Sequence, residues 1–395
     1  MAKHSQHTSQ HHCPHCLIVP TYLLKNMVAH ATKSGGGGPA AVAFNAIAPG
    51  QSQRRLKGLL DSISGSAKTR TLRRANLVLD VSVKGAAKER ALESLMGEAP
   101  ARRRSAAAAT PRLQRAIHDG RKLHLLPGKL VRSERGKASA DDDVNWAFDY
   151  SGVVHEFFRA VFGRHSLDSK GLPLVSTVHH RDGYTNAFWN GTQMAYGDGD
   201  GEVFGSFTKS LDVIAHELAH GVTEYMSGLE YQDQPGALNE SFSDVMGSLV
   251  KQWRLNHTAS QADWLIGNDL FLPGVDAKGI RSLAAPGTAY DNEAMGQDPQ
   301  PSHMRNYYDG DDDSGGVHIN SGIPNHAFYT TCMTLGGNAW GEPGQIWYKG
   351  FSTLKRLSTF KDARAATLAA ARALFGRTSK QAKAVSEGWK RVGVK

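Results

Sequence analysis

Apolar residues recur at helical spacing in three stretches of the chain, and β-forming residues dominate a fourth. Residues 141–162 carry large apolar side chains every three or four positions, which is typical of an amphipathic helix. Helical patterns also cover residues 209–227, ending at Gly228, and residues 237–254. Residues 173–204 instead combine β-formers with glycine turns. We therefore expect a lobe rich in antiparallel strands, followed by a lobe that is mainly helical.

The N-terminal part of the chain has a different texture. An amphipathic stretch at residues 17–24 is followed by four glycines at residues 35–38, which are typical of a flexible linker. Residues 50–100 are helix-forming and strongly basic. At residues 102–109 a basic triplet precedes small residues, a composition that suits an exposed and cleavable boundary. These features predict a leader over residues 1–110.

Two parts of the chain also carry net charges of opposite sign. The net charge of +9 combines +17 over residues 1–140 (24 Lys/Arg, 7 Asp/Glu) with −8 over the rest (22 Lys/Arg, 30 Asp/Glu). Opposite charges could draw the two parts together, although a basic and partly disordered leader has the same composition. A nucleic-acid-binding leader is a third reading. Because Tyr22 and Phe44 are its only aromatic residues, we expect no nucleic-acid partner.

The distribution of apolar residues bears on whether the protein enters a membrane or is secreted. No apolar run reaches the roughly 18 residues that a transmembrane helix needs. The N-terminus also lacks the apolar core of a Sec-type signal peptide. We therefore expect no membrane partner and secretion by a leaderless route, with a cytoplasmic precursor as the alternative.

Three cysteines are too few for a disulfide framework. Cys13 and Cys16 form a CxxC among histidines, but no second ligand pair follows at the spacing of a zinc knuckle. A metal-binding role and a reactive or incidental thiol pair both stay open for these two residues.

Residues 216–220 form an HExxH motif. On a helix, His216 and His220 share one face, so both imidazoles can reach one metal ion while Glu217 points into the same cleft. The residues around the motif are largely apolar, which predicts a buried helix. Unpaired polar groups in such a place cost several kcal/mol, so the two histidines and the glutamate need partners.

A carboxylate partner follows on the next predicted helix. Glu240 comes 20 residues after His220 and shares a helix face with Asp244. Two histidines and a glutamate, with the fourth position left to water, form the ligand set of a catalytic zinc. Asp244 then suits the outer shell, where it would fix the tautomer of one imidazole, and Asn239 would do the same for the other.

At this point the chain resembles the thermolysin-like zinc metallopeptidases from about residue 111 to residue 394. Six motifs match that family in order: NAFWNG at 186–191, GDGDG at 197–201, HExxH at 216–220, GALNESFSD at 236–244, GIRS at 279–282 and GGVHINSG at 315–322. Residues 17–24 look like the start of the short propeptide of the protealysin-like subgroup. Thr21 stands where that subgroup usually has a second proline, and residues 50–100 run longer than such leaders commonly do.

The resemblance implies roles for further residues. Glu217 would be the general base, Tyr231 and His318 would stabilise the oxyanion, and Asp313 would orient His318. Asn186 and the backbone of Ala187 would bind the substrate as an added strand, and Arg281 would hold a substrate carbonyl. The walls of the pocket after the scissile bond would be Phe204, Val213, Ile266 and Ile280. This predicts cleavage before bulky apolar residues such as Leu or Phe.

The resemblance also implies the architecture and the partners. We expect an α+β fold of two lobes, with a β-rich lobe over residues 111–227 that ends in the zinc helix and a helical lobe over residues 228–395. The protein would be a monomeric endopeptidase that acts on proteins or peptides, with its own propeptide as inhibitor. A binding protein on the same scaffold is the alternative, and the presence of Glu217 argues against it.

Calcium is not expected. The acids that bind calcium in the long-leader enzymes are replaced here by Lys251, Leu265 and Asn268, and only Asp212 and Asp263 remain. A hard dication needs several oxygen ligands, and an ammonium group repels it.

Overall fold

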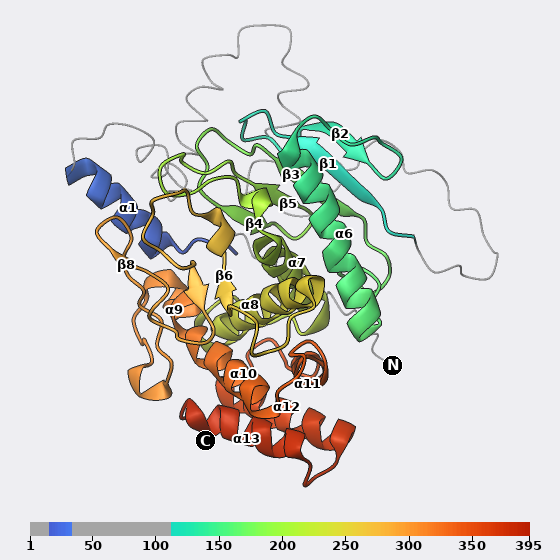
Figure 1. Ribbon diagram of the computed structural model, residues 1–395, viewed down its shortest axis with the longest axis vertical. Helices are drawn as coiled ribbons and strands as arrows, with labels where there is room; N and C mark the ends of the chain where they lie inside the picture. The colour runs from blue at the N-terminus through green and yellow to red at the C-terminus, as the bar shows by residue number, and fades with distance from the viewer. Residues whose placement is uncertain (1–15, 34–111) are drawn as a thin grey trace, which may run out of the picture. The chain divides into compact units, whose positions relative to one another are not determined.

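The computed structural model describes residues 16–33 and 112–395, which belong to one compact unit (Figure 1). The features expected at residues 35–38, 50–100 and 102–109, and Cys13, lie outside the described residues. Among the helices within them, none is long and apolar enough to cross a membrane.

A five-stranded mixed sheet comes first, in the order β2-β1-β3-β5-β4. Its strands are β1 (Arg115–Asp119), β2 (Lys129–Ser133), β3 (Leu174–Val178), β4 (Ala187–Trp189) and β5 (Met194–Tyr196). The outer pairs β1–β2 and β4–β5 are antiparallel, whereas β3 runs parallel to both β1 and β5. The expectation of an antiparallel lobe was therefore wrong at the centre of the sheet. Helix α6 (Asp142–Phe162) returns the chain to the end where β1 begins, so β3 starts beside β1 and runs the same way.

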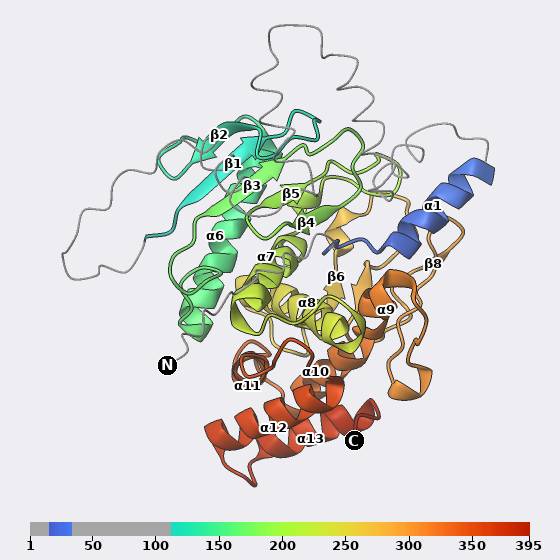
Figure 2. The same ribbon diagram turned by 180° about the vertical axis from the view of Figure 1, so that it is seen from behind.

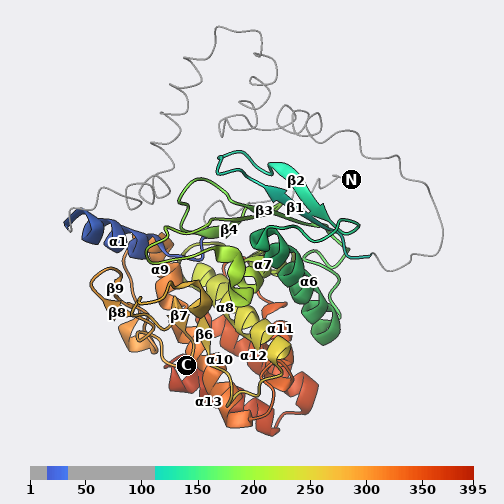
Figure 3. The same ribbon diagram turned by 45° about the horizontal axis from the view of Figure 1, so that its top comes forward.

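The bounds of α6 agree with the predicted helix over residues 141–162. Asp141 caps its start by accepting a hydrogen bond from the backbone N–H of Asp143. Gly163 ends it in the left-handed conformation, with φ at 65°. The helix packs against β1 and β3 and so covers one face of the sheet (Figures 1 and 3).

Two long helices, α7 (Leu211–Met226) and α8 (Asp233–Leu255), pack closely between the sheet and the C-terminal helices (Figures 1 and 2). Gly247 permits this approach, because a Cβ there would lie 2.6 Å from the carbonyl oxygen of Asp212. Helix α8 starts at Asp233 rather than near residue 237 as expected, because Pro235 sits in its first turn, where no N–H is needed.

The rest of the described chain is mainly helical, as expected. Five helices follow: α9 (Asp312–Asn320), α10 (Gly322–Leu335), α11 (Glu342–Phe351), α12 (Phe360–Phe375) and α13 (Lys380–Arg391). Between α8 and α9, short strands pair as β6 (Leu265–Ile266) with β7 (Arg281–Ser282), and β8 (Asp291–Asn292) with β9 (Gly296–Gln297). Single turns of 3-10 helix are Phe207–Lys209, Asn268–Leu270 and Met304–Asn306. The leader helix α1 (Thr21–Lys33) lies against α9 (Figure 3).

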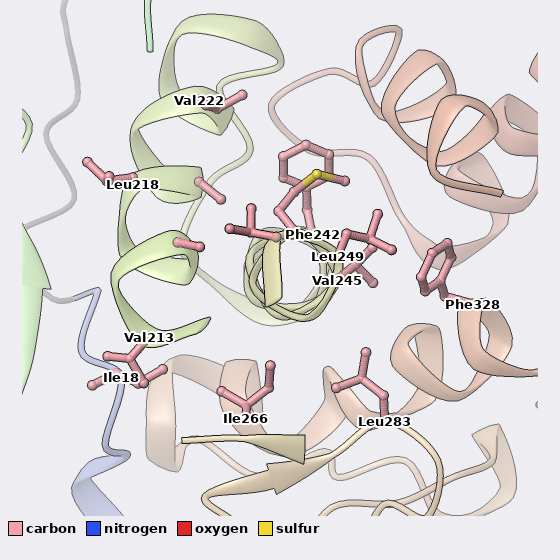
Figure 4. Close-up of a cluster of buried hydrophobic side chains, with 14 of the residues drawn as sticks. Ile18, Val213, Leu218, Val222, Phe242, Val245, Leu249, Ile266, Leu283 and Phe328 are labelled. Carbon is pink, nitrogen blue, oxygen red and sulfur yellow. The ribbon is translucent and has the colours of Figure 1, made fainter. Parts of the chain in front are cut away.

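The core surrounds α8. Figure 4 looks along this helix, whose apolar side chains meet residues from α7, β6 and α10 on different sides. The labelled members are Phe242, Val245 and Leu249 on α8, with Ile18, Val213, Leu218, Val222, Ile266, Leu283 and Phe328 around them. Residues 235–252 of α8 are all buried, so its polar side chains must find partners inside the protein. Glu240 and Asp244 are among these side chains.

Candidate active site

The two histidines of the HExxH motif and Glu240 converge at the contact of α7 with α8. Nε2 of His216 lies 3.0 Å from Nε2 of His220. Each of these nitrogens lies 3.4 Å from a carboxylate oxygen of Glu240. All three side chains are buried. The structure therefore brings together the residues that the spacing predicted as metal ligands.

The other nitrogen of each imidazole has a partner on α8. Nδ1 of His216 lies 2.9 Å from Oδ1 of Asp244, and Nδ1 of His220 lies 2.9 Å from Oδ1 of Asn239. Both imidazoles therefore turn Nε2 towards Glu240, the orientation that a metal ion requires. Asp244 is itself held by Arg281, whose guanidinium lies 2.8 Å away.

The geometry of this group fits a zinc ion. Three ligand atoms at zinc-bond length in a tetrahedron lie about 3.3 Å apart, close to the separations of 3.0 and 3.4 Å seen here. Oε2 of Glu240 is buried and makes no hydrogen bond within the described residues. A buried carboxylate oxygen without a donor is costly, and a cation between the three side chains would remove that cost.

Glu217 lies beside the ligand group on α7. Its Oε2 accepts a hydrogen bond from the backbone N–H of Trp189 on β4, at 3.1 Å. Its Oε1 is buried and makes no hydrogen bond within the described part of the chain. Burial raises the pKa of the Glu217 carboxyl to about 8. The side chain is thus anchored at one oxygen, and the other oxygen is left for a proton.

Tyr231 and His318 meet on the far side of Glu240, although 87 residues separate them in sequence. The Tyr231 hydroxyl donates to Glu240 and lies 3.1 Å from Nε2 of His318. Asp313 lies 2.7 Å from Nδ1 of His318 and also accepts from its backbone N–H. Burial lowers the pKa of His318, but Asp313 and Glu240 outweigh burial and raise it to about 9. His318 therefore favours the protonated form, in which it is a donor.

The leader lies along the edge strand β4, on which Ala187 lies and which Asn186 directly precedes. Asn186 accepts from the N–H of Val19 at 3.0 Å and donates to its carbonyl at 2.9 Å. Ile18 donates to the carbonyl of Ala187 at 3.4 Å. Arg281 donates to the carbonyl of Ile18 at 2.9 Å. Of the leader stretch 17–24, only the first residues are extended, because α1 begins at Thr21.

The four residues expected in the specificity pocket are all buried: Phe204, Val213, Ile266 and Ile280. They belong to the same apolar cluster as Ile18 of the leader. Figure 4 shows the side chains of Ile18 and Val213 pointing towards one another. The structure thus places an apolar leader side chain at the expected pocket.

Sequence reasoning missed two contacts of this site. Trp189, which holds Glu217 through its backbone N–H, lies within the NAFWNG motif, but a backbone contact leaves no signal in the residue type. Asn325 on α10 donates to Asp244 at 2.9 Å across 81 positions of sequence. No local pattern could have indicated that contact.

Lys251 lies at the position where the long-leader enzymes bind calcium and where the sequence argued against a calcium site. Its ammonium nitrogen lies 2.7 Å from Asp212, 2.9 Å from the Leu265 carbonyl, 3.0 Å from Asn268 and 3.1 Å from Asp263. Burial lowers the pKa of this amine, but Asp212 and Asp263 outweigh burial and raise it. A protonated lysine therefore sits among four oxygen atoms.

A buried His–His–Glu group lies beside an edge strand on which an extended peptide backbone rests. Such an arrangement serves the hydrolysis of peptide bonds, and it defines the protein as a metallopeptidase.

The chain belongs to the thermolysin family of metallopeptidases. The family's catalytic domain, described as "Thermolysin metallopeptidase, catalytic domain", matches residues 110–224, and its alpha-helical domain matches residues 227–394. An extracellular metalloprotease of Pectobacterium carotovorum subsp. carotovorum is 51% identical over 282 residues, which cover 71% of this chain and 81% of that protein. The thermolysin of Alicyclobacillus acidocaldarius is 39% identical over 70% of this chain and 50% of its own length.

A solved structure extends the likeness to the leader. The precursor of protealysin, a metalloproteinase from Serratia proteamaculans, has a TM-score of 0.75 and 39% sequence identity. The match covers 96% of this chain and 100% of that one. The predicted membership of the thermolysin-like enzymes and of their protealysin-like subgroup is thereby confirmed, as is the fold class.

Proposed function

We propose that this metallopeptidase is a neutral endopeptidase with one zinc ion held by His216, His220 and Glu240. The observation that carries the proposal is the position of the leader backbone, which lies extended along β4 with the carbonyl of Leu17 at 2.7 Å from Nε2 of His318. A peptide in this position has a carbonyl beside both the ligand group and the donors Tyr231 and His318. Zinc in the site would supply a Lewis acid that polarises the carbonyl and makes a water molecule acidic.

The side chains around the carbonyl have complementary roles in this proposal. Glu217 takes the proton from the attacking water at Oε1 and delivers it to the departing amine nitrogen. Tyr231 and His318 donate hydrogen bonds to the oxyanion as it forms. Asp313 keeps His318 protonated and correctly turned. Asp244 and Asn239 hold the two ligating imidazoles.

Substrate would bind as the leader does. Asn186 and Ala187 would pair with its backbone, and Arg281 would hold the carbonyl of the residue after the cut bond. The side chain of that residue would enter the apolar pocket, which favours Leu or Phe. The substrates are therefore proteins or peptides with exposed apolar residues.

The leader would act as an inhibitor within its own chain. Residues 17–19 use the donors and acceptors of Asn186, Arg281 and His318 that a substrate needs. Because the leader is covalently attached, its effective concentration at the site is high, and modest intrinsic affinity is enough to exclude substrate. A precursor form, as in the protealysin precursor, follows from this arrangement.

The remaining parts of the proposal concern calcium, location and assembly. Lys251 supplies the positive charge that calcium would otherwise bring, so calcium is not needed. Secretion is supported by the name of the Pectobacterium relative, an extracellular metalloprotease. We propose a monomer that acts without nucleic acid or membrane.

Hydrolysis of a casein-type substrate tests the function. Wild-type protein should cleave it and stop when a zinc chelator is added. Glu217→Gln should keep one zinc per chain but lose about 10²–10⁴-fold in rate, whereas Glu240→Ala should lose zinc and activity together. Metal content by elemental analysis separates the two variants. A Glu217→Gln protein with a near-normal rate would remove Glu217 as the base.

A further inference from the structure

Three consecutive carbonyl groups of the leader each have a donor of their own. The carbonyl of Leu17 accepts from Nε2 of His318 at 2.7 Å, and that of Ile18 accepts from Arg281 at 2.9 Å. The carbonyl of Val19 accepts from Asn186 at 2.9 Å. The leader therefore lies in one defined register along the site.

This register identifies the peptide bond that lies at the reacting centre. Oxyanion donors face the carbonyl whose C–N bond is to be broken. Nε2 of His318 lies 3.1 Å from the Tyr231 hydroxyl and 3.4 Å from Glu240, so it belongs to the reacting centre. Of the leader carbonyls that the structure describes, that of Leu17 is the one paired with this nitrogen. The bond in question is therefore Leu17–Ile18.

The direction of the leader and its side chains agree with this assignment. Leu17 pairs antiparallel with Phe188, and Ile18 donates to the carbonyl of Ala187. The Ile18 side chain is fully buried and points towards Val213 (Figure 4). An apolar residue thus follows the bond, as the proposed specificity requires.

The proposed base is fixed to the strand that holds the leader. Trp189, whose N–H anchors Glu217, lies two residues beyond Ala187 on β4. The strand that places the Leu17–Ile18 bond therefore also places the carboxylate that would take up the proton. Glu217, the donors Tyr231 and His318, and the Leu17–Ile18 bond are therefore arranged for hydrolysis of that bond.

We infer that the Leu17–Ile18 bond is a site of self-cleavage within the same molecule, so the leader is held as a substrate rather than as a plug alone. One water is consumed and the C–N bond breaks, leaving a carboxylate on Leu17 and an amino group on Ile18. Glu217 carries the proton from the water to the departing nitrogen. The inference rests on the proposed endopeptidase function.

The cut would not release the inhibitory segment. Downstream of Ile18, α1 buries Leu23 and Leu24, and the Asn26 amide donates to the carbonyl of Met295 at 2.9 Å. These contacts keep the new end at Ile18 attached to the site. Cleavage would therefore be visible by mass before it is visible as activity.

The test is time-resolved mass spectrometry of the purified full-length protein with zinc bound. We expect early release of residues 1–17 and a new N-terminus at Ile18, on the chain or on a leader fragment, at a rate independent of protein concentration. Glu217→Gln should show no such end. Ile18→Pro should also be uncut there, because proline lacks the N–H that pairs with Ala187, yet it should cleave casein. Ile18→Val is the matched control and should be cut.

Each outcome separates this inference from the proposed function. Casein cleavage without any end at Ile18 would overturn the inference and leave the function standing. If zinc-loaded wild type showed neither casein cleavage nor an end at Ile18, the proposed function would be overturned. A rate that rises in proportion to protein concentration would show cleavage between molecules, which contradicts the assignment to one chain.

Discussion

The ammonium of Lys251, on α8, lies among oxygen atoms from Asp212 on α7 and from the segment 263–268. Asp212 is fully buried, so its charge needs compensation. In this position a lysine joins the same three segments that a dication would join, without depending on an ion in solution. Its side chain is only 10% exposed, so the contact is largely screened from water.

We predict that a calcium-selective chelator barely shifts the melting temperature of wild-type protein at constant zinc. Lys251→Gln should lower the free energy of unfolding by about 3–5 kcal/mol, because it leaves a buried carboxylate unpaired. Lys278→Gln, at an exposed lysine, is the control and should have little effect. A large fall in melting temperature on chelation of calcium from wild type would contradict the proposal.

The apolar pocket leads to a second prediction at the scale of single residues, which concerns the substrate residue after the cut bond. One methylene in such a pocket is worth about 1–3 kcal/mol, or roughly 10–200-fold in rate. Peptides with Leu or Phe after the cut bond should therefore be cleaved faster than those with Ala or Asp. Profiling of a peptide library measures this preference. Cleavage mainly before acidic residues would show that the pocket is assigned wrongly.

Among the elements, the approach of α7 to α8 sets the metal-ligand group. At Gly247 a new Cβ would meet the backbone of Asp212 at 2.6 Å and the Cβ of His216 at 3.6 Å. Backbone cannot move aside as a flexible side chain does, so the two helices would have to separate. The ligands on α7 and Glu240 on α8 would then move apart.

We predict that Gly247→Ala lowers the free energy of unfolding by about 1–3 kcal/mol, measured by urea denaturation, and weakens zinc binding. A decrease in the free energy of unfolding would be informative, because alanine in a helix is otherwise favoured over glycine by about 1 kcal/mol. Gly205→Ala is the matched control, because its Cβ would lie 3.5 Å from the nearest atom, an ordinary contact. Unchanged stability of Gly247→Ala would show that the helices adjust without cost.

His179 links the end of β3 to the start of α6 and to the loop that follows β5. Its ring nitrogens lie 2.7 Å from Asp198 and 2.9 Å from Asp141, and Asp143 is close by. Asp143 is itself bound by the hydroxyls of Ser206 and Thr208. The hydrogen bond to Asp198, together with Asp141, raises the pKa of His179 from 6.5 to about 9 against the effect of burial.

A raised pKa in the folded state stabilises the protein when the group is protonated. The contribution of His179 should therefore be complete below pH 6.5 and should disappear as the pH rises through about 9. We predict that the difference in urea midpoint between wild type and His179→Gln shrinks over this range. His124→Gln, at an exposed histidine, should show no such trend. A constant difference would mean that the imidazolium contributes nothing.

For the whole molecule, the central question is how the leader leaves. The leader over residues 1–110 is basic, whereas residues 141–395 are acidic, and the end of the leader has the composition of an exposed boundary. We predict that wild-type protein shortens from its N-terminal side to an end between about residues 100 and 115. Glu217→Gln should stay at 42.7 kDa. Intact mass over time is the measurement. Identical trimming of the inactive variant in a protease-free preparation would rule out self-maturation.

The sequence by itself determined the features that repeat over a few residues. Helical period and capping residues placed α6 and α7 nearly to the residue. The four-residue spacing of His216 and His220, and of Glu240 and Asp244, put each pair on one helix face, because an α-helix returns to the same side after about 3.6 residues. Together with the family resemblance, the identities of Lys251, Leu265 and Asn268 were enough to argue against calcium.

Tertiary structure decided what depends on contacts between distant segments. The parallel centre of the sheet follows from the path of α6, which no strand pattern contains. Tyr231 and His318 were assigned through family resemblance, since a lone tyrosine or histidine has no spacing to interpret. The carbonyl of Leu17 meets His318 across 301 positions, and this contact alone selects the leader bond at the reacting centre. Such contacts arise when buried surfaces pack, and packing depends on three-dimensional shape rather than on local order.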